Sequence, residues 1–469
     1  MTDRERQPLW TSAELAAAVG GRLEGSPFDV YGVSIDSREI EPGDLFVALA
    51  GERDGHDFAP AAMARGAVAA LTTRPVAGPD IVVHDTLHAL ERMGEAARDR
   101  AALARRAAVT GSVGKTSVTQ AMAAALALAG PSHASVKSYN NHIGVPLTLA
   151  RMPQGTERAV FEIGMNHGGE ITPLSRMVRP HVAVVTVVGP VHVENFPDGE
   201  IGVARAKAEI FDGMQPGGVA VLNADDRWFE LLSAAAHARG VEVRAFGTGE
   251  TCAARLTDFR VEDGRAWLSA RIDGAPVSFP LAQTGRHWGL NALATVLAVE
   301  ALGAPREAAT EALARFAPLA GRGEEVRVRL PRGEVTLIDE SYNANPISMR
   351  AALATLGARK ARGRRIAVLT DMLELSDSEA VHAALAEPLL DAGVDTAFLA
   401  GPHMRALHDA LPPGRRGGWQ GRAEDIATVV VEALQPGDVV MIKGSKGSKA
   451  SLVVEAIKAA GRDAGGDAR

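Results

Sequence analysis

The segment 109–117, with the sequence VTGSVGKTS, combines residue types that bind phosphate. Glycines let backbone amides face an anion, a lysine supplies positive charge, and a threonine hydroxyl can bind Mg²⁺. The apolar run 107–110 predicts a strand before this segment, and the run 117–129 predicts a helix after it. A strand, a glycine-rich loop and a helix in this order are typical of a phosphate loop that binds ATP. The expected phosphate-binding residues are Gly111, Ser112, Gly114, Lys115, Thr116 and Ser117.

One position departs from the usual phosphate-loop pattern. Val109 stands where that pattern has glycine or alanine, five residues before the second glycine. The alternative interpretation is therefore a chance glycine turn in an α/β domain. The flanking strand and helix favour the phosphate loop.

Three further residues are candidates for metal binding or catalysis. Glu162 closes the strand-like run 158–163, and a carboxylate at a strand end beside a phosphate loop commonly holds Mg²⁺. His192 follows the apolar run 182–188 and could face the same crevice. Lys207 lies in a helical pattern, and reaction with CO₂ would turn its cation into an anionic carbamate able to bridge metal ions. The simpler alternatives are a solvent-exposed carboxylate, a structural histidine and a surface lysine.

Two segments in the second half of the chain also carry polar groups suited to a nucleotide. The segment GRHWGLNALA, 285–294, contains Asn291, which could contact a base at a domain boundary. Arg322 lies in GRGEE on a presumed linker and could reach a triphosphate when domains close. The segment DESYNANP, 339–346, ends a predicted strand, where open α/β sheets bind ligands.

Composition excludes several classes of protein. The 469-residue chain is long enough for two to four domains, and 46% of its residues are hydrophobic. Its net charge of −7, without a basic stripe, argues against a nucleic-acid partner. No apolar run is long enough to span a bilayer, and the polar N-terminus lacks the apolar core of a signal peptide. With a single cysteine, these features predict a cytoplasmic protein without membrane insertion, and a monomer is the default expectation.

Hydrophobic patterning predicts an α/β chain of three units, 1–84, 85–318 and 319–469. A helical stretch, 87–106, leads into the second unit, and a helix at 291–302 closes it. Between them, shorter alternating runs at 251–280 predict a small antiparallel patch. The expected strands of parallel sheets are 158–163, 182–188 and 219–223 in the second unit and 335–339, 365–370, 396–400 and 438–443 in the third.

Together these motifs resemble the Mur ligases, ATP-dependent amide-forming enzymes of peptidoglycan precursor synthesis, over nearly the whole chain. The similar segments are DSREIEPGDLFVALAGERDGHDF, TGSVGKTS, SYNNHIGVPLT, EIGMNHGGEI, AKAEIF, LNADD, DESYNANP and TDMLEL. The resemblance implies a small mixed α/β N-terminal domain for a UDP-sugar substrate, a central P-loop-type parallel-sheet ATPase domain, and a Rossmann-like C-terminal domain that contacts the nucleotide and the incoming amine.

Within the family, these segments are most similar to members that add D-alanyl-D-alanine (D-Ala-D-Ala) to a UDP-N-acetylmuramoyl-tripeptide (UDP-MurNAc-tripeptide). The resemblance therefore implies those two substrates. It also implies that ATP phosphorylates the tripeptide carboxylate and that the dipeptide amine attacks the acyl phosphate. The third residue of the tripeptide stays open between diaminopimelate and lysine.

The resemblance also assigns roles to individual residues. It implies ATP, two Mg²⁺ ions and a CO₂-derived carbamate on Lys207. The catalytic residues would be Lys115, Lys207 and His192. The metal ligands would be Thr116, Glu162, His192 and Lys207. Nucleotide contacts beyond the phosphate loop would be Asn291, Arg322 and Glu340. Substrate contacts would be Ser37, Arg38, Asn140, Asn141, Asn343 and Asn345.

Two residues depart from the family pattern, and three rival functions remain. Trp288 stands where the family has asparagine, and Glu340 stands where many members have aspartate at a position associated with the ribose. A sister ligase, such as another Mur enzyme or folylpolyglutamate synthase, would share the phosphate loop but accept a different amine. A P-loop ATPase or kinase would pass phosphate to water or a hydroxyl, and a non-catalytic nucleotide-binding module would do neither.

Overall fold

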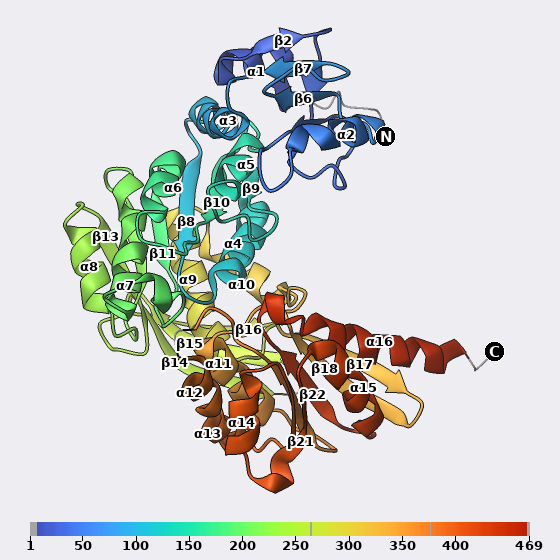
Figure 1. Ribbon diagram of the computed structural model, residues 1–469. Coiled ribbons are helices and arrows are strands. Elements are labelled where there is room, and N and C mark those ends of the chain that lie inside the picture. The colour runs from blue at the N-terminus through green and yellow to red at the C-terminus, as the bar shows by residue number, and fades with distance from the viewer. Residues whose placement is uncertain (1–6, 263–264, 376, 467–469) are drawn as a thin grey trace.

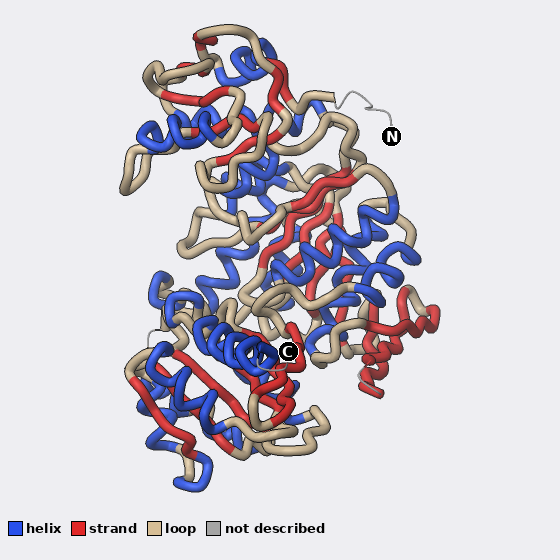
Figure 2. Tube along the Cα trace, turned by 90° about the vertical axis from the view of Figure 1, so that its right-hand side faces the viewer, coloured by secondary structure: helices blue, strands red, loops and turns tan. Residues whose placement is uncertain are grey.

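The computed structural model describes residues 7–262, 265–375 and 377–466. The chain runs from a small N-terminal part through a central part to a C-terminal part, each with its own β-sheet (Figure 1). Sheets flanked by helices recur along the molecule in the perpendicular view (Figure 2). The predicted fold class, three α/β domains, is confirmed.

The N-terminal part contains a five-stranded mixed sheet and a separate two-stranded one. In sheet order the five strands are β2 (Arg22–Glu24), β7 (Asp80–Val82), β6 (Ala69–Thr72), β5 (Asp44–Val47) and β4 (Gly32–Ser34), and the pair is β1 (Trp10–Thr11) with β3 (Asp29–Val30). Helix α1 (Ser12–Val19) begins at a capping box between Thr11 and Glu14 and ends at Gly20, whose φ is 65°. The other helices here are α2 (Ala59–Ala64) and α3 (Thr86–Arg100).

The central part is built on a nine-stranded sheet, counted over the described residues. In sheet order its strands are β16 (Ala275–Leu281), β15 (Arg265–Ile272), β14 (Ala254–Glu262), β13 (Glu242–Gly247), β12 (Val219–Asn223), β11 (Val182–Val185), β8 (Arg105–Thr110), β10 (Arg158–Glu162) and β9 (Ser132–Ala134). Strands β9 to β14 pair in parallel, whereas β14, β15 and β16 pair antiparallel. The predicted antiparallel patch is therefore present, as an extension of the same sheet.

Helices cover both faces of the central sheet with separate apolar cores. One face packs against α4 (Lys115–Ala129), α9 (His287–Ala301) and α10 (Arg306–Arg315). The other face packs against α5 (Gly144–Ala150), α6 (Ile171–Val178), α7 (Glu200–Ala208) and α8 (Phe229–His237). Burial on both faces explains why these strands read as continuous apolar runs in the sequence.

The C-terminal part repeats this layering around a six-stranded sheet, again counted over the described residues. In sheet order its strands are β17 (Glu324–Leu330), β18 (Gly333–Glu340), β22 (Val439–Lys443), β19 (Arg365–Thr370), β20 (Thr396–Ala400) and β21 (Arg416–Gln420). Helices α11 (Pro346–Gly357), α13 (Ala386–Asp391) and α14 (Met404–Ala410) cover one face, and α12 (Ser378–Ala383) packs against α14. Helices α15 (Ala423–Ala433) and α16 (Ser451–Gly466) cover the other face.

Two predicted helix boundaries were wrong. The helix expected over 87–106 ends at Arg100, and Arg105 and Arg106 open strand β8. Their run RRAAVT is rich in helix formers, but pairing with β10 and β11 in a buried sheet overrides that propensity. Helix α9 begins at His287 rather than at Asn291, so the four residues before Asn291 contribute the first helical turn.

The structure contains no helix, within its described residues, with the length and apolarity needed to cross a bilayer.

Candidate active site

A cavity of about 620 Å³ lies where the central and C-terminal parts meet. The central part contributes the phosphate loop, Glu162 and the first turns of α9. The C-terminal part contributes the loops that follow β18, β19 and β22. The polar and charged residues that line the cavity include Ser112, Lys115, Thr116, Ser138, Asn140, Glu162, Thr186, Asn291, Arg322, Glu340, Tyr342, Asn343, Asn345, Ser348, Glu374, Lys443 and Lys446.

The phosphate loop connects β8 to α4 through a backbone that requires glycine. Gly111 and Gly114 have φ values of 148° and 85°, which disfavour any side chain. A Cβ on Gly111 would lie 1.9 Å from the Oγ1 of Thr186, so the neighbouring strand end also excludes one. Val109 is buried inside β8, which places the departure from the usual pattern in the strand and not in the loop. Helix α4 therefore begins at Lys115 with its N-terminus at the cavity, where backbone amides favour an anion.

Lys115 folds back onto its own loop. Its Nζ donates to the carbonyl of Gly111 at 2.7 Å. Burial lowers its pKa, and the negative charge of Glu162 opposes that shift. The lysine is thus a desolvated cation next to a buried carboxylate, suited to interact with phosphate oxygens.

Glu162 has one oxygen bonded and one left free. Asn140 donates to its Oε1 at 2.7 Å, whereas its Oε2 is buried without a hydrogen-bond partner among the described residues. The side chain is 1% exposed, so this orphaned oxygen is costly unless a ligand satisfies it. The Thr116 hydroxyl lines the same cavity. Carboxylate and hydroxyl oxygens are the donors that Mg²⁺ prefers, so these residues fit a Mg²⁺ ion.

The Ser138 hydroxyl joins the central part to the C-terminal part. It lies 3.0 Å from the Thr116 hydroxyl and accepts from the Tyr342 hydroxyl at 3.1 Å. Arg322 donates to Thr116 at 3.1 Å and stacks on the Tyr342 ring, with 4.0 Å from its guanidinium carbon to the ring centroid. The predicted linker arginine therefore reaches the phosphate loop from the chain that enters the C-terminal part.

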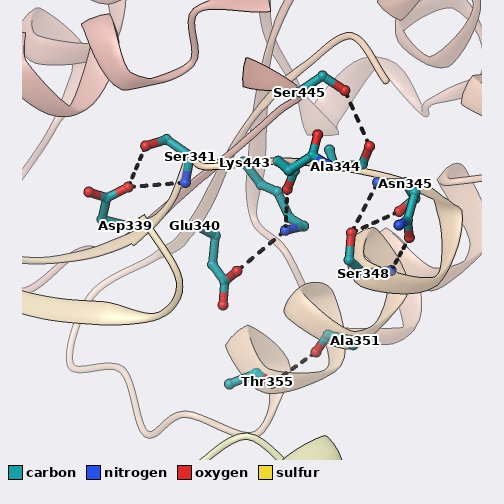
Figure 3. A network of polar contacts seen from close by, with 11 residues as sticks. Asp339, Glu340, Ser341, Ala344, Asn345, Ser348, Ala351, Thr355, Lys443 and Ser445 are labelled. Carbon is teal, nitrogen blue, oxygen red and sulfur yellow. Dashed lines mark hydrogen bonds and ion pairs between the residues drawn. The ribbon is translucent and has the colours of Figure 1, made fainter. Parts of the chain in front are cut away.

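The C-terminal wall of the cavity is an ordered polar network (Figure 3). Lys443, at the end of β22, lies 3.3 Å from Glu340 at the end of β18 and donates to the carbonyl of Asn343 at 3.0 Å. Asn345 caps α11 through a reciprocal pair of hydrogen bonds with Ser348, so its side chain holds the helix start. Asn343 and Asn345 both line the cavity.

His192 and Lys207 lie beside the cavity without lining it. His192, whose φ is 55°, pairs through its Nδ1 with Glu374 of the C-terminal part at 3.2 Å. Burial lowers the pKa of His192, and Glu374 opposes that shift. Lys207 is 3% exposed on α7, and no acidic side chain pairs with it in the part of the chain that the structure describes. Its burial, with the nearby charge of Lys115, holds its pKa well below the usual value.

The predicted UDP-sugar contacts lie outside the cavity lining. Ser37 and Arg38 follow β4, and exposed Arg38 pairs with Asp36 at 2.6 Å. Their neighbour Glu39 pairs with Lys137 of the central part at 2.6 Å, which links this loop to the segment before Asn140. The side chain of Asn141 accepts from backbone amides at the start of α5, whereas Asn140 lines the cavity.

Several residues that line the cavity lie in segments that the sequence analysis quoted, but they were not themselves predicted as site residues. Ser138 and Tyr342 lie inside quoted motifs, and Glu374 lies inside TDMLEL, yet none was chosen. The scarcity of lysine, eight among 50 basic residues, was a usable signal for Lys443 and Lys446. No group of three His, Cys, Asp or Glu that could hold a metal ion occurs within the described ranges. Two of the four predicted ligands, Thr116 and Lys207, are of other residue types.

The comparisons with known proteins agree with this arrangement. The family models that match are the Mur ligase family catalytic domain over 29–124, the Mur ligase middle domain over 109–299, and the Mur ligase glutamate ligase domain over 321–446. The UDP-N-acetylmuramoyl-tripeptide–D-alanyl-D-alanine ligase of Escherichia coli is 34% identical, covering 96% of this chain and 98% of its own. The ligase of the same name from Rickettsia prowazekii is 31% identical, covering 95% and 99%.

A solved structure extends the likeness to three dimensions. It is the UDP-N-acetylmuramoylalanyl-D-glutamyl-2,6-diaminopimelate–D-alanyl-D-alanyl ligase of Acinetobacter baumannii, 28% identical with a TM-score of 0.82. The alignment covers 97% of this chain and 99% of that one. A phosphate loop that faces a C-terminal α/β domain across one cavity, with these matches, defines an ATP-dependent amide-forming ligase. The chain belongs to the Mur ligase family.

Proposed function

We propose that this protein joins D-Ala-D-Ala to UDP-MurNAc-tripeptide through an acyl-phosphate intermediate, with ATP converted to ADP and phosphate. The observation that carries the proposal is the single cavity in which the phosphate loop, a buried carboxylate and the C-terminal loops meet. The shared name of full-length relatives from Escherichia coli and Rickettsia prowazekii supports the choice of substrates.

The chemistry follows from the charges on the cavity wall. A carboxylate is a poor electrophile, and phosphorylation gives it a leaving group. The carboxylate and ATP repel each other, and Lys115 with Arg322 would offset that repulsion and stabilise the transferring phosphoryl group. The Tyr342–Ser138 contact supports exclusion of water while the acyl phosphate awaits the amine, because it holds the C-terminal part against the phosphate loop.

Mg²⁺ fits the donors on the nucleotide side of this cavity. Thr116 and the orphaned oxygen of Glu162 would hold it, and the ion would neutralise charge on the nucleotide phosphates. We extend the proposal to a second Mg²⁺ near His192 and Lys207. The nucleotide itself would lie along Asn291, Arg322 and Glu340.

The depressed pKa of Lys207 would favour its carbamylation. Only a neutral amine attacks CO₂, and burial favours the neutral form of this lysine. The nitrogen lone pair bonds to the carbon of CO₂, one proton is released, and the side chain becomes an anionic carbamate. That anion would compensate the charge of Lys115, the cation that acts on Lys207.

The unit 1–84, with Ser37 and Arg38, would bind the UDP-sugar, 85–318 would bind ATP, and 319–469 would contact the nucleotide and the dipeptide. Asn140, Asn141, Asn343 and Asn345 would position the peptide substrates, directly or through the loops they hold. We further propose a monomer that acts in the cytoplasm, and a tripeptide ending in diaminopimelate, the residue in the name of the Acinetobacter baumannii enzyme.

Phosphate release from ATP tests the proposal. UDP-MurNAc-tripeptide, ending in diaminopimelate or in lysine, is supplied with and without D-Ala-D-Ala, and products are identified by mass spectrometry. Release that requires the dipeptide and yields the UDP-pentapeptide supports the proposal. Phosphate release at the same rate with and without the dipeptide would indicate a sister ligase or an ATPase. The Lys115→Ala variant should release no phosphate while keeping its thermal unfolding midpoint.

A further inference from the structure

Lys446 is a cation in the cavity whose charge is not compensated. The other lysines and the arginine that line the cavity are each bonded: Lys115 to Gly111, Arg322 to Thr116, and Lys443 to Glu340. Lys446 is exposed to the cavity, and among the described residues its ammonium has no hydrogen bond or ion pair. A free cation facing a binding cavity indicates an anionic ligand.

Neighbouring lysines show that this is not a general property of the region. Lys443 pairs with Glu340, Lys449 pairs with Glu424 at 3.2 Å, and Lys458 pairs with Glu324 at 3.2 Å. Lys446 lies between the first two in KGSKGSK. Of the lysines in KGSKGSK, Lys443 and Lys446 both line the cavity, and only Lys446 has no acidic partner among the described residues.

The fold places Lys446 where open α/β sheets bind ligands. It follows β22, which lies between β18 and β19 in the six-stranded sheet. Helix α11 leaves β18 toward one face of the sheet, whereas α16 follows β22 on the opposite face. Neighbouring strands whose helices diverge open a crevice at their carboxyl ends, and Lys446 stands at that crevice.

The chemistry of the reaction supplies an anion for this position. The acceptor dipeptide attacks through a neutral amine, but its own carboxylate stays ionised and loses water when it enters the cavity. A desolvated carboxylate needs a cationic partner. Lys115 and Arg322 are already bonded at the phosphate loop, and Lys443 pairs with Glu340, which leaves Lys446.

We propose that Lys446 binds the C-terminal carboxylate of the acceptor dipeptide. This inference rests on the proposed function. The contact is ionic and does not change during the reaction, so Lys446 selects and orients the acceptor without taking part in bond formation. It would make the enzyme prefer an acceptor with a free carboxylate over one whose C-terminus is blocked.

A change of charge on both protein and ligand tests the inference. The full-length enzyme, Lys446→Gln and a control, Lys449→Gln, are assayed with D-Ala-D-Ala and with D-alanyl-D-alaninamide, in which the carboxylate is a neutral amide. Lys449 lies on the same loop but outside the cavity lining, and it already has Glu424 as a partner. Initial rates are measured over a range of acceptor, ATP and UDP-substrate concentrations.

We expect Lys446→Gln to raise the KM for D-Ala-D-Ala by about 10- to 100-fold, the loss typical of a hydrogen-bonded charge pair. The KM for ATP and kcat at saturating acceptor should stay within about twofold, and the variant should use the amide as well as the wild type does. Lys449→Gln should match the wild type throughout. An equal loss with dipeptide and amide, or a rise in the KM for ATP alone, would overturn the inference. If the wild-type enzyme does not use D-Ala-D-Ala as an acceptor, the proposed function is refuted instead.

Discussion

The side chain of Ile347 fills the space that a side chain on Gly189 would need. A Cβ on Gly189, in the loop after β11, would lie 2.0 Å from the Cδ1 of Ile347 at the start of α11. The backbone of Gly189 also donates to Ser112 of the phosphate loop at 2.9 Å and accepts from it at 3.1 Å. The C-terminal part therefore rests on the residue that holds the phosphate loop.

Substitution of Gly189 should separate domain docking from substrate binding. Gly189→Ala should cost little because the end of Ile347 can rotate away, whereas Gly189→Val should lower kcat about tenfold or more by misplacing the C-terminal part. The KM for the UDP-substrate should change less. Adding Ile347→Ala to Gly189→Val should restore part of kcat in steady-state assays. If Ile347→Ala restores none of the lost kcat, the valine at position 189 acts through the phosphate loop alone.

Removal of Lys207 should abolish activity in a way that a small acid can reverse. Lys207→Ala deletes the proposed carbamate, and we expect a loss on the order of 10²-fold or more, as for removal of a group that stabilises charge in a transition state. Acetate or formate should restore part of the rate by entering the vacated space. The same salts should leave the wild type unchanged. Full activity without rescue would remove the carbamate from the mechanism.

Arg322 should affect ATP more than the UDP-substrate. Arg322→Lys keeps the charge but loses the planar group that stacks on Tyr342 and donates to Thr116, so the KM for ATP should rise roughly 5- to 10-fold. Tyr342→Phe keeps the ring and loses only the contact with Ser138, so its effect should be smaller. Initial-rate kinetics with each substrate varied in turn would reveal the opposite pattern if Arg322 served the UDP-substrate.

His133 should make the fold sensitive to mild acid. Its burial lowers its pKa from 6.5 to about 4, while its Nε2 contacts the carbonyl of Thr148 at 2.7 Å. The unfolded chain therefore binds more protons between these values, so stability is complete above pH 6.5 and falls as the pH drops toward 4. Linkage gives a loss of about 1–2 kcal/mol at pH 5 from this residue. His133→Gln should be less stable at pH 7.5 but should lose less stability than the wild type between pH 7.5 and pH 5, measured by denaturant unfolding.

Local patterns predicted the elements of the parallel sheets well. The runs 219–223, 365–370 and 396–400 coincide with β12, β19 and β20, because strands buried on both faces are short apolar blocks bounded by turns. Strands β17 and β21 were not predicted. Both lie at the edges of the six-stranded sheet, and β17 alternates charged and apolar residues, so neither forms an apolar block.

The site residues that lie in one short motif could be predicted from the sequence. The residues that meet only when distant segments come together could not. The phosphate loop is local, so its residues could be named from spacing alone. The meeting of Ser138, Tyr342 and Lys446 around one cavity depends on how two domains face each other, which no spacing encodes. Asn345 shows the converse: its sequence motif is clear, but its side chain is engaged in capping α11.

The apolar core of the N-terminal part includes α3 and continues into α5 of the central part. Leu90 and Met93 of α3 and Leu147 of α5 pack in that core, and the Trp10 indole donates to the carbonyl of Ala150 at 3.0 Å. A chimaera that exchanges the first 84 residues for those of a relative would cut through this core and expose apolar surface. Its junction would have to follow Ala150, and the exchange would then replace the phosphate loop as well. The N-terminal part and the phosphate loop are in this sense inherited together.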